Sequence, residues 1–279
     1  MAQTLGLERL DAQLLLLHAL GKPGHDRAWL LAHDADELPD AVAQQFRQLS
    51  LRRAAGEPLA YIVGRKEFFG LELQVDARVL IPRPDTETLV EWSLEVLQQP
   101  AMPPTTPTLQ VLDLGTGSGA IALAICHRLQ RSHPNAQVLA VDASANALAV
   151  ASANAARLQL PVQFLESHWL QRVSGHFHLI VSNPPYIANL DPHLAALKHE
   201  PLQALTAGSD GLDDIRQIVA QAPTHLHAGG WLLLEHGYDQ AAAVCTLLHQ
   251  RGFAQVQSRP DLAGIARCSG GQWQGRPGT

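Results

Sequence analysis

Four consecutive residues, Asn183-Pro184-Pro185-Tyr186, carry the strongest chemical signal in the chain. They follow an apolar run at 177–182 that is typical of a buried strand, and open α/β sheets bind ligands at the carboxyl ends of strands. Asn183 offers a side-chain carbonyl, and the Pro184 carbonyl precedes a proline that has no N–H. Two acceptors can thus each take one hydrogen of a planar –NH₂ group, with the Tyr186 ring against its plane. We predict a site for an amide or an exocyclic amine.

A glycine-rich loop lies about seventy residues earlier in the chain. The apolar run 109–114 predicts a strand, Gly115-Thr116-Gly117-Ser118-Gly119 follows it, and Ala120 begins a segment typical of a helix. Because glycine has no Cβ, a ligand can approach this backbone and meet the free N–H groups at the helix N-terminus. The loop also fits the G-x-G-x-x-G/A dinucleotide pattern, so a nicotinamide enzyme is an alternative interpretation.

An acidic residue, Asp142, ends the next predicted strand. It stands where a bound nucleoside would present its ribose hydroxyls, and both nicotinamide and methionine-based nucleosides carry that ribose. The tetrapeptide 183–186 distinguishes the two, because hydride transfer has no need of it. Methylation of an amino group does need it, since the protein must hold a poor nitrogen nucleophile in line with a methyl that is already activated on a sulfonium. The residues therefore favour an N-methyltransferase that uses S-adenosylmethionine.

Composition limits the class of protein. The chain has 279 residues and 46% apolar content, enough for one sizeable core and a small extra domain. No run approaches the roughly eighteen apolar residues of a membrane span, and Met1–Arg9 lacks a signal-peptide pattern, so we expect a cytoplasmic protein. Cys126, Cys245 and Cys268 lie far apart, which predicts reduced thiols rather than a disulfide framework.

The charged and metal-binding residue types argue against two further classes. A formal net charge of −6 has the wrong sign for a protein whose affinity comes from neutralising phosphates. The pairs His176/His178 and His225/His227 have no nearby carboxylate or thiol to complete a ligand set, so we predict no metal site.

The pattern of elements predicts two architectures in one chain. Residues 5–60 have helical periodicity, with a second helix from about Pro39 to Ala55. The alternation at 70–75, followed by 78–81, predicts a β-hairpin, and a helix follows at 86–98. After a proline-rich loop, helices alternate with strands near 109–114, 136–142, 161–166, 177–183, 229–235, 252–258 and 263–268. We predict a doubly wound, mainly parallel, seven-stranded Rossmann-like sheet preceded by a small all-helical domain.

Together the motifs resemble those of the peptide chain release factor glutamine methyltransferases. The resemblance is carried by Asp113 to Gly119, by Asn183 to Tyr186, and by two upstream segments, Glu67-Phe68-Phe69-Gly70 and Ile81-Pro82-Arg83-Pro84-Asp85-Thr86-Glu87. The tetrapeptide alone is shared with many amino-methyltransferases, including DNA adenine enzymes. Its combination with the segment from Ile81 to Glu87 is specific to this family, and the resemblance spans nearly the whole chain.

The resemblance implies methyl transfer to the side-chain amide nitrogen of the glutamine in the Gly-Gly-Gln motif of class I release factors. It implies S-adenosylmethionine contacts from Gly115, Thr116, Gly117, Ser118, Gly119, Asp142, Trp169 and Asn183. It also implies that Asn183, Pro184, Pro185 and Tyr186 hold the glutamine and are the catalytic residues. Arg83 and Glu87 are further candidates for substrate contact, with structural ion pairing weighed equally for both.

The resemblance also implies a domain plan, with a helical substrate-recognition domain at 1–65, a β-hairpin connector at 66–80 and a methyltransferase domain at 81–279. The partner would be a release factor, with no membrane and with nucleic acid disfavoured, and we expect a monomer. Two residues depart from the family pattern: His168 replaces a frequent acid before the tryptophan, and Lys198 replaces a frequent arginine.

Three other functions stay open at this point: an amino-methyltransferase acting on adenine or guanine, a nicotinamide dehydrogenase, and a non-catalytic nucleotide-binding module. The C-terminal region contains Gly270-Gly271-Gln272, the tripeptide that the family methylates. We interpret it as a coincidence, with a weaker hypothesis that a mobile tail from Ser269 to Thr279 visits the pocket as a competitor. The pair Glu235-His236 is expected to be structural.

Overall fold

A computed structural model describes residues 5–98 and 108–275 of the chain. The chain divides into two compact units, residues 1–65 and residues 66–279. The proline-rich stretch at 100–107 lies outside the described residues.

The N-terminal unit is helical. Its helices are α1 (Arg9–Ala19), α2 (Arg27–Ala32), α3 (Asp40–Ala54) and α4 (Leu59–Val63). Leu15, Leu49 and Ile62 form its small core, together with Ala19. The predicted second helix is confirmed, and its bounds differ by one residue at each end.

A two-stranded hairpin, β1 (Arg65–Phe68) and β2 (Leu71–Gln74), follows. Its turn residues Phe69 and Gly70 both have positive φ, 53° and 80°, as the tight turns that join twisted strands require. The predicted pairing of 70–75 with 78–81 is wrong. The two-residue turn makes β1 the partner of β2. The Val79 N–H instead donates to the Asp76 carbonyl at 3.1 Å, within a local turn.

The second unit contains a seven-stranded sheet in the order β5-β4-β3-β6-β7-β9-β8. The strands are β3 (Gln110–Leu114), β4 (Gln137–Asp142), β5 (Val162–Glu166), β6 (Phe177–Ser182), β7 (Leu226–Glu235), β8 (Ala254–Pro260) and β9 (Ala266–Gln272). The first five pair in parallel, and β9 is antiparallel to both β7 and β8. The predicted doubly wound fold is confirmed.

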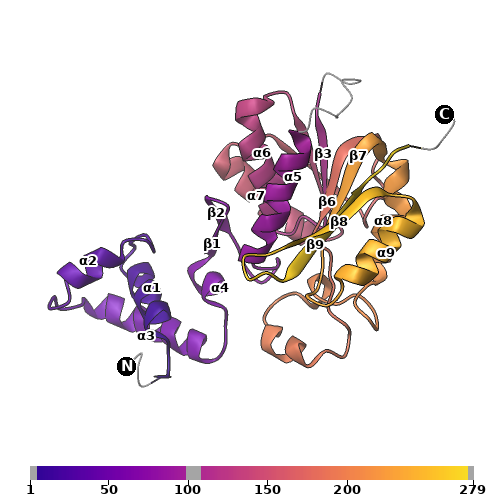
Figure 1. The fold of residues 1–279 in the computed structure, drawn as a ribbon. Coiled ribbons are helices and arrows are strands. Elements are labelled where there is room, and N and C mark those ends of the chain that lie inside the picture. Colours follow the sequence, from indigo (N-terminus) through magenta and orange to yellow (C-terminus); the bar gives the residue numbers. More distant parts are fainter. Residues whose placement is uncertain (1–4, 99–107, 276–279) are drawn as a thin grey trace. The chain divides into compact units, whose positions relative to one another are not determined.

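Helices cover both faces of this sheet (Figure 1). One face carries α5 (Glu87–Leu97), α6 (Ala120–Ser132) and α7 (Ala145–Leu158), and the other carries α8 (Asp213–Gln221) and α9 (Ala241–Arg251). Neighbouring strand residues alternate between the two cores: Val111 and Leu179 belong to one, Leu112 and Ile180 to the other. This explains why the strands are continuous apolar runs instead of alternating polar and apolar residues.

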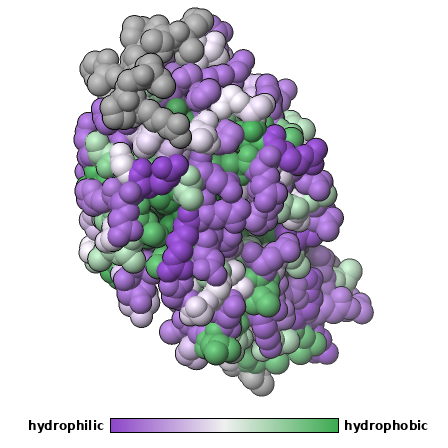
Figure 2. All heavy atoms as spheres, turned by 90° about the vertical axis from the view of Figure 1, so that its right-hand side faces the viewer, coloured by the Kyte–Doolittle hydropathy of each residue, from purple (hydrophilic) through white to green (hydrophobic). Residues whose placement is uncertain are grey.

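Short 3₁₀ turns complete the second unit. They are η2 (Pro84–Thr86), η3 (Pro192–Leu197), η4 (Leu202–Ala204) and η5 (Ala222–Thr224). No helix among residues 5–98 and 108–275 is long and apolar enough to cross a membrane. The face shown in Figure 2 is mainly hydrophilic, with hydrophobic side chains in separate groups.

The C-terminal tripeptide is part of the sheet, which overturns the mobile-tail hypothesis for residues 269–272. Strand β9 extends to Gln272 and lies between β7 and β8. A Cβ at Gly270 would lie 2.6 Å from the Leu232 carbonyl oxygen, so this glycine serves close packing of neighbouring strands. The Gln272 amide is buried and donates to the Gly229 carbonyl at 2.9 Å. Gln272 is therefore held in the fold, and residues 276–279 lie outside the described part of the chain.

One buried side chain, Asn154 on α7, ties the hairpin to the glycine loop. Its Oδ1 accepts from the Gln74 N–H at 2.7 Å, and its Nδ2 donates to the Gln74 and Ser118 carbonyls at 3.0 Å each. The side-chain oxygen and the side-chain –NH₂ group of Asn154 therefore both have protein partners.

We predict that Asn154→Ala lowers the free energy of unfolding by about 2–4 kcal/mol, because it leaves buried backbone groups unpaired. Urea denaturation of the purified protein measures this change. The control is Asn146→Ala, an exposed position on the same helix, which should change stability by less than about 0.5 kcal/mol. Equal effects of the two substitutions would contradict the structural role of Asn154.

Candidate active site

The candidate site lies where the strand order of the sheet reverses. From β3 the chain proceeds to β4 on one side, whereas β6 lies on the other side of β3. Leu114 pairs with Ser182, and the Ser182 hydroxyl donates to the Leu114 carbonyl at 2.7 Å. The next residues, Gly115 and Asn183, therefore leave neighbouring strands at the same edge, which is where open α/β sheets bind ligands.

The three loop glycines serve two different purposes. All have positive φ: 72° at Gly115, 56° at Gly117 and 85° at Gly119. A Cβ at Gly115 would lie 3.2 Å from the Trp169 ring, and one at Gly119 would lie 2.9 Å from Leu123. A Cβ at Gly117 would meet no protein atom within 4 Å, because this glycine faces an open pocket. Gly115 and Gly119 thus serve packing, and Gly117 leaves space for a ligand.

Two carboxylates hold the loop. The Asp142 carboxylate accepts from the N–H groups of Gly117 and Ser144, both at 2.9 Å, and burial raises its pKa. Asp113 lies fully buried and accepts from the Thr116 hydroxyl at 2.7 Å and the Ala122 N–H at 3.2 Å. Burial raises the pKa of Asp113 to about 7. The Thr116 hydroxyl is thus already hydrogen-bonded to Asp113.

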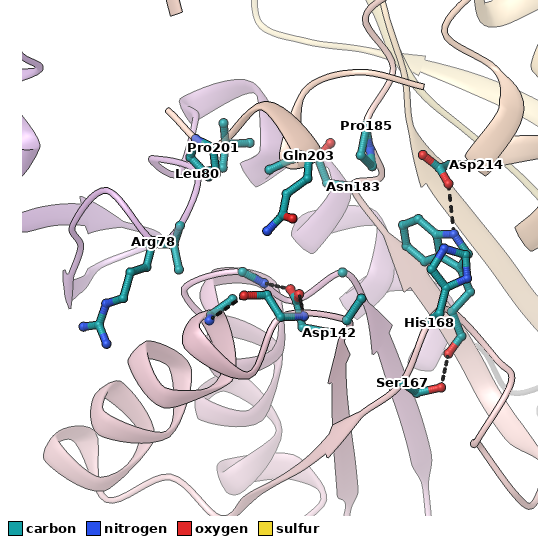
Figure 3. Close-up of a pocket in the computed structure, with 18 residues that line it drawn as sticks. Arg78, Leu80, Asp142, Ser167, His168, Asn183, Pro185, Pro201, Gln203 and Asp214 are labelled. Carbon is teal, nitrogen blue, oxygen red and sulfur yellow. Dashed lines mark hydrogen bonds between the residues drawn. The ribbon is translucent and has the colours of Figure 1, made fainter. Parts of the chain in front are cut away.

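A pocket of about 300 Å³ opens above the loop. Its lining includes Arg78, Val79, Leu80, Gly115, Gly117, Asp142, Ala143, Ser144, Ala147, Ser167, His168, Trp169, Asn183, Pro185, Pro201, Gln203, Ala204 and Asp214. In Figure 3, Gln203 points into this pocket from the side opposite Asp142. The predicted residues Gly115, Gly117, Asp142, Trp169 and Asn183 thus share one pocket, whereas Thr116, Ser118 and Gly119 do not line it.

Trp169 is held in place by an acid that the sequence did not single out. The tryptophan has a strained φ of 47°, and its Nε1 donates to the Asp214 carboxylate at 3.0 Å (Figure 3). Burial raises the pKa of Asp214, and the bond from Trp169 opposes that rise. In the sequence, Asp213-Asp214 has the pattern of ordinary N-terminal helix acids. His168 also lines the pocket, with its ring centroid 5.8 Å from that of Trp169.

Asn183 borders a second, smaller pocket of about 80 Å³. The lining of this pocket also includes Leu80, Arg83, Pro184, Tyr186, Ile187, Leu197, Ala204 and Leu205. Pro185 lines the larger pocket instead. Asn183 therefore lies between the two pockets, and its Nδ2 donates to the Thr86 hydroxyl at 3.3 Å. That bond leaves the side-chain carbonyl available to a ligand.

The other end of the tetrapeptide is anchored by polar contacts. The Tyr186 hydroxyl donates to the Glu235 carboxylate at 3.4 Å, and the Tyr186 carbonyl accepts from the Gln240 amide at 3.0 Å. Burial, with the charge of Glu235, raises the pKa of Tyr186, so this phenol stays protonated. Glu235, expected only as a structural residue, contacts a candidate catalytic residue directly.

Arg83 and Glu87 have different surroundings. Arg83 lines the smaller pocket and forms an ion pair of 2.5 Å with the buried Glu200, which also accepts from the Ile81 N–H at 3.2 Å. Glu87 lines neither pocket, and its carboxylate accepts from the Phe69 N–H at 3.0 Å. Its contact supports the hairpin turn, and substrate contact by Glu87 stays a prediction. Lys198 lines neither pocket.

Within the described residues, no group of three or more His, Cys, Asp or Glu side chains is arranged to hold a metal ion. The His227 ring contacts those of His176 and His178, at 5.7 and 4.5 Å between centroids.

Comparison with known proteins defines the class of this chain. Residues 2–64 match the PrmC N-terminal domain, and residues 94–211 match the methyltransferase small domain. Among solved structures, the hMettl16 catalytic domain has a TM-score of 0.57 at 15% identity, covering 83% of this chain and 81% of that chain. A methyltransferase from Pyrococcus furiosus has a TM-score of 0.52 at 18% identity, covering 82% of this chain and 98% of that one. These structures show a methyltransferase fold.

Relatives over the whole length define the family. The release factor glutamine methyltransferase of Bordetella pertussis is 50% identical over 270 residues, which are 95% of each chain. That of Burkholderia pseudomallei is 51% identical over 280 residues, covering 96% of this chain and 93% of the relative. The chain belongs to the release factor glutamine methyltransferases, which confirms the resemblance inferred from its motifs.

We predict that Gly117→Val weakens S-adenosylmethionine binding by about 10- to 100-fold, because the branched side chain fills the ligand space above the loop. Calorimetric titration measures the affinity. Gly175→Val is the matched control: Gly175 also has a positive φ, of 92°, and open space around its Cβ, but lines neither pocket. Unchanged affinity in the Gly117 variant would mean that the loop is only a turn.

Proposed function

We propose that this protein transfers a methyl group from S-adenosylmethionine to the side-chain amide nitrogen of the glutamine in the Gly-Gly-Gln motif of class I release factors. The observation that carries the proposal is the position of Asn183, which borders both a large pocket beside the glycine loop and a small pocket beside Tyr186. A group in one pocket can thus reach a group in the other. The names of the relatives support the substrate class.

The larger pocket fits the cofactor. Gly117 keeps ligand space open over the loop, the Asp142 carboxylate faces the pocket as an acceptor for ribose hydroxyls, and the Trp169 ring provides an apolar wall. Gly115 permits the close approach of Trp169, and Thr116, Ser118 and Gly119 shape the loop from beneath. S-adenosylmethionine, when bound, supplies a methyl group that is already activated on a sulfonium.

The tetrapeptide supplies what an amide nitrogen lacks. Its lone pair is delocalised into the carbonyl, so an amide is a poor nucleophile. The Asn183 Oδ1 and the Pro184 carbonyl each accept one N–H of the glutamine amide, which favours electron density on nitrogen and fixes its direction. Pro185 keeps the Pro184 carbonyl free of a competing donor, and the Tyr186 ring lies against the amide plane. Orientation of this kind can lower a barrier by up to about 7–11 kcal/mol.

The amide proton has no strong base beside it among the tetrapeptide residues. Once methylated, the nitrogen is strongly acidic, so we propose that the proton passes to solvent. Arg83 lines the small pocket and holds the segment around Ile81 through Glu200, so its contribution to substrate binding includes the shape of this wall.

The domain plan and cellular setting belong to the same proposal. Residues 1–65 would recognise the release factor, the hairpin at 66–80 would join the two parts, and residues 81–279 would carry out the transfer. We propose that the enzyme acts as a monomer in the cytoplasm, with protein favoured over nucleic acid as substrate. The formal charge of −6 supports a protein substrate over a polyphosphate one.

Incubation of the protein with methyl-labelled S-adenosylmethionine tests the substrate class, with release factor, DNA and RNA in parallel. We expect label on the release factor, and peptide mapping should locate it on the Gly-Gly-Gln glutamine. Label on DNA or RNA alone would contradict the proposal and support a base methyltransferase.

We predict that Asn183→Ala lowers kcat by about 100-fold or more, because it removes one acceptor and leaves a buried amide N–H of the substrate unpaired. Steady-state labelling of the release factor measures this loss, and S-adenosylmethionine affinity should fall much less. The control is Asn189→Ala, an exposed residue six positions later, which should retain activity. An Asn183→Ala variant with activity within twofold of the parent would rule out this role.

A further inference from the structure

One carboxylate in the wall of the larger pocket has an oxygen that the protein leaves unused. Asp214, in the first turn of α8, is half-buried and lines this pocket. Its Oδ1 accepts from the Trp169 Nε1 at 3.0 Å. In the described part of the chain, no hydrogen bond or ion pair reaches its Oδ2. Figure 3 shows this second oxygen on the side of the carboxylate that faces away from the Trp169 ring and toward the pocket.

The bond to Trp169 determines which oxygen of Asp214 a ligand can reach. An indole N–H can only donate, so it holds one carboxylate oxygen in place and leaves the other for a second donor. Trp169 is itself fixed, because its carbonyl accepts from the Ser167 hydroxyl at 3.1 Å. Its φ of 47° costs on the order of 1–3 kcal/mol and persists only where the surroundings hold it. The Asp214 carboxylate therefore has a set orientation before a ligand binds.

The other carboxylate and the one arginine in the described lining of this pocket have partners within the protein. Both oxygens of the Asp142 carboxylate accept from backbone N–H groups, at 2.9 Å each. The Arg78 guanidinium donates to the neighbouring Asp76 carboxylate at 2.6 and 2.9 Å. Of the two lining carboxylates, only Asp214 thus has an oxygen without a protein donor.

The chemistry of the cofactor supplies what this oxygen lacks. S-adenosylmethionine carries an ammonium, a sulfonium and one carboxylate, so its net charge is positive. It has two nitrogen groups that donate hydrogen bonds, the ammonium of the amino-acid arm and the amine of the adenine ring. Burial raises the pKa of Asp214, so its ionised form gains from any donor that a ligand brings. A hydrogen bond to an ionised carboxylate is about twice as strong as one between neutral groups.

We propose that Asp214 is a cofactor-binding residue, whose Oδ2 accepts a hydrogen bond from a nitrogen of bound S-adenosylmethionine. The same carboxylate thus holds the Trp169 ring with one oxygen and the cofactor with the other. This inference rests on the proposed function for the identity of the cofactor alone. It is independent of which substrate receives the methyl group.

Asp214→Asn tests the proposal, because the asparagine keeps an oxygen for Trp169 and places a –NH₂ group where the Oδ2 was. We expect the dissociation constant of S-adenosylhomocysteine, measured by calorimetric titration, to rise about tenfold or more. S-adenosylhomocysteine lacks the sulfonium, so the loss reports on nitrogen donors. Asp213→Asn is the matched control. It removes the same charge one residue earlier, from a side chain that is 64% exposed and paired with Arg216, and should change the affinity by less than about twofold.

Two analogues of this ligand identify the donor and separate binding from support of Trp169. Methylthioadenosine lacks the amino-acid arm, and S-inosylhomocysteine has an oxygen in place of the adenine amine. If the ammonium is the donor, Asp214→Asn and the parent should bind methylthioadenosine equally. If the adenine amine is the donor, Asp214→Asn should bind S-inosylhomocysteine at least as tightly as the parent does. Either result supports the proposal.

A loss of the same size with all three ligands would mean that Asp214 acts only through Trp169, and it would overturn the proposal. Unchanged affinity of Asp214→Asn for S-adenosylhomocysteine would overturn it too.

These measurements need no release factor, so they separate this inference from the proposed function. If the parent binds S-adenosylhomocysteine and Asp214→Asn binds it equally well, only the inference fails. If the parent labels no release factor but the ligand series gives the expected pattern, the proposed substrate fails and the role of Asp214 stands. A parent protein that binds none of the three ligands would overturn both.

Discussion

The parallel pairing of β3 with β6 at the point where the strand order reverses is the constraint on which the rest of the site depends. It places Gly115 and Asn183 side by side at one edge of the sheet, although 68 residues separate the paired strand ends Leu114 and Ser182. The glycine loop can then border one pocket and the tetrapeptide another, with Asn183 between them. Transfer of a group between two bound ligands requires that the two pockets share a border, as they do at Asn183. Neither the glycine loop nor the tetrapeptide could form both pockets alone.

Buried carboxylates hold this edge in shape. Asp113 and Asp142 hold the glycine loop, Asp214 orients Trp169, and Glu235 accepts from the Tyr186 hydroxyl. Burial of a charge is unfavourable unless donors surround it, and here each carboxylate accepts from backbone or side-chain donors within the site. The raised pKa of Asp113 and of Glu235, about 7 for each, is the measurable consequence of that burial.

Local patterns predicted the fold well and the supporting residues poorly. Apolar runs buried on both faces and the loop glycines sufficed for the strands, the order of elements and the two motifs. The hairpin partner was missed because the positive φ of the non-glycine Phe69 is not visible in alternation alone. The end of β9 was missed because the glycine content of 269–272 is typical of a flexible tail, whereas Gly270 is there to permit close strand packing.

The polar partners of the site could not be predicted for a different reason. Thr86 meets Asn183 across 97 residues, and Glu235 meets Tyr186 across 49, so each contact exists only once the sheet has formed. In the sequence Thr86 has the appearance of an ordinary residue at a helix start. The same reasoning applies to Asp214, whose bond to Trp169 spans 45 residues.

The central claim is that Asn183 holds the substrate amide with its side-chain carbonyl while it borders the cofactor pocket. The most direct test is a crystal structure of the protein with S-adenosylhomocysteine and a release factor. We expect the glutamine amide nitrogen to lie within hydrogen-bond distance, about 3 Å, of both the Asn183 Oδ1 and the Pro184 carbonyl oxygen. The cofactor sulfur should lie on the other side of that nitrogen from these acceptors. A glutamine bound away from the tetrapeptide, or an Asn183 amide with its –NH₂ group toward the glutamine, would contradict it.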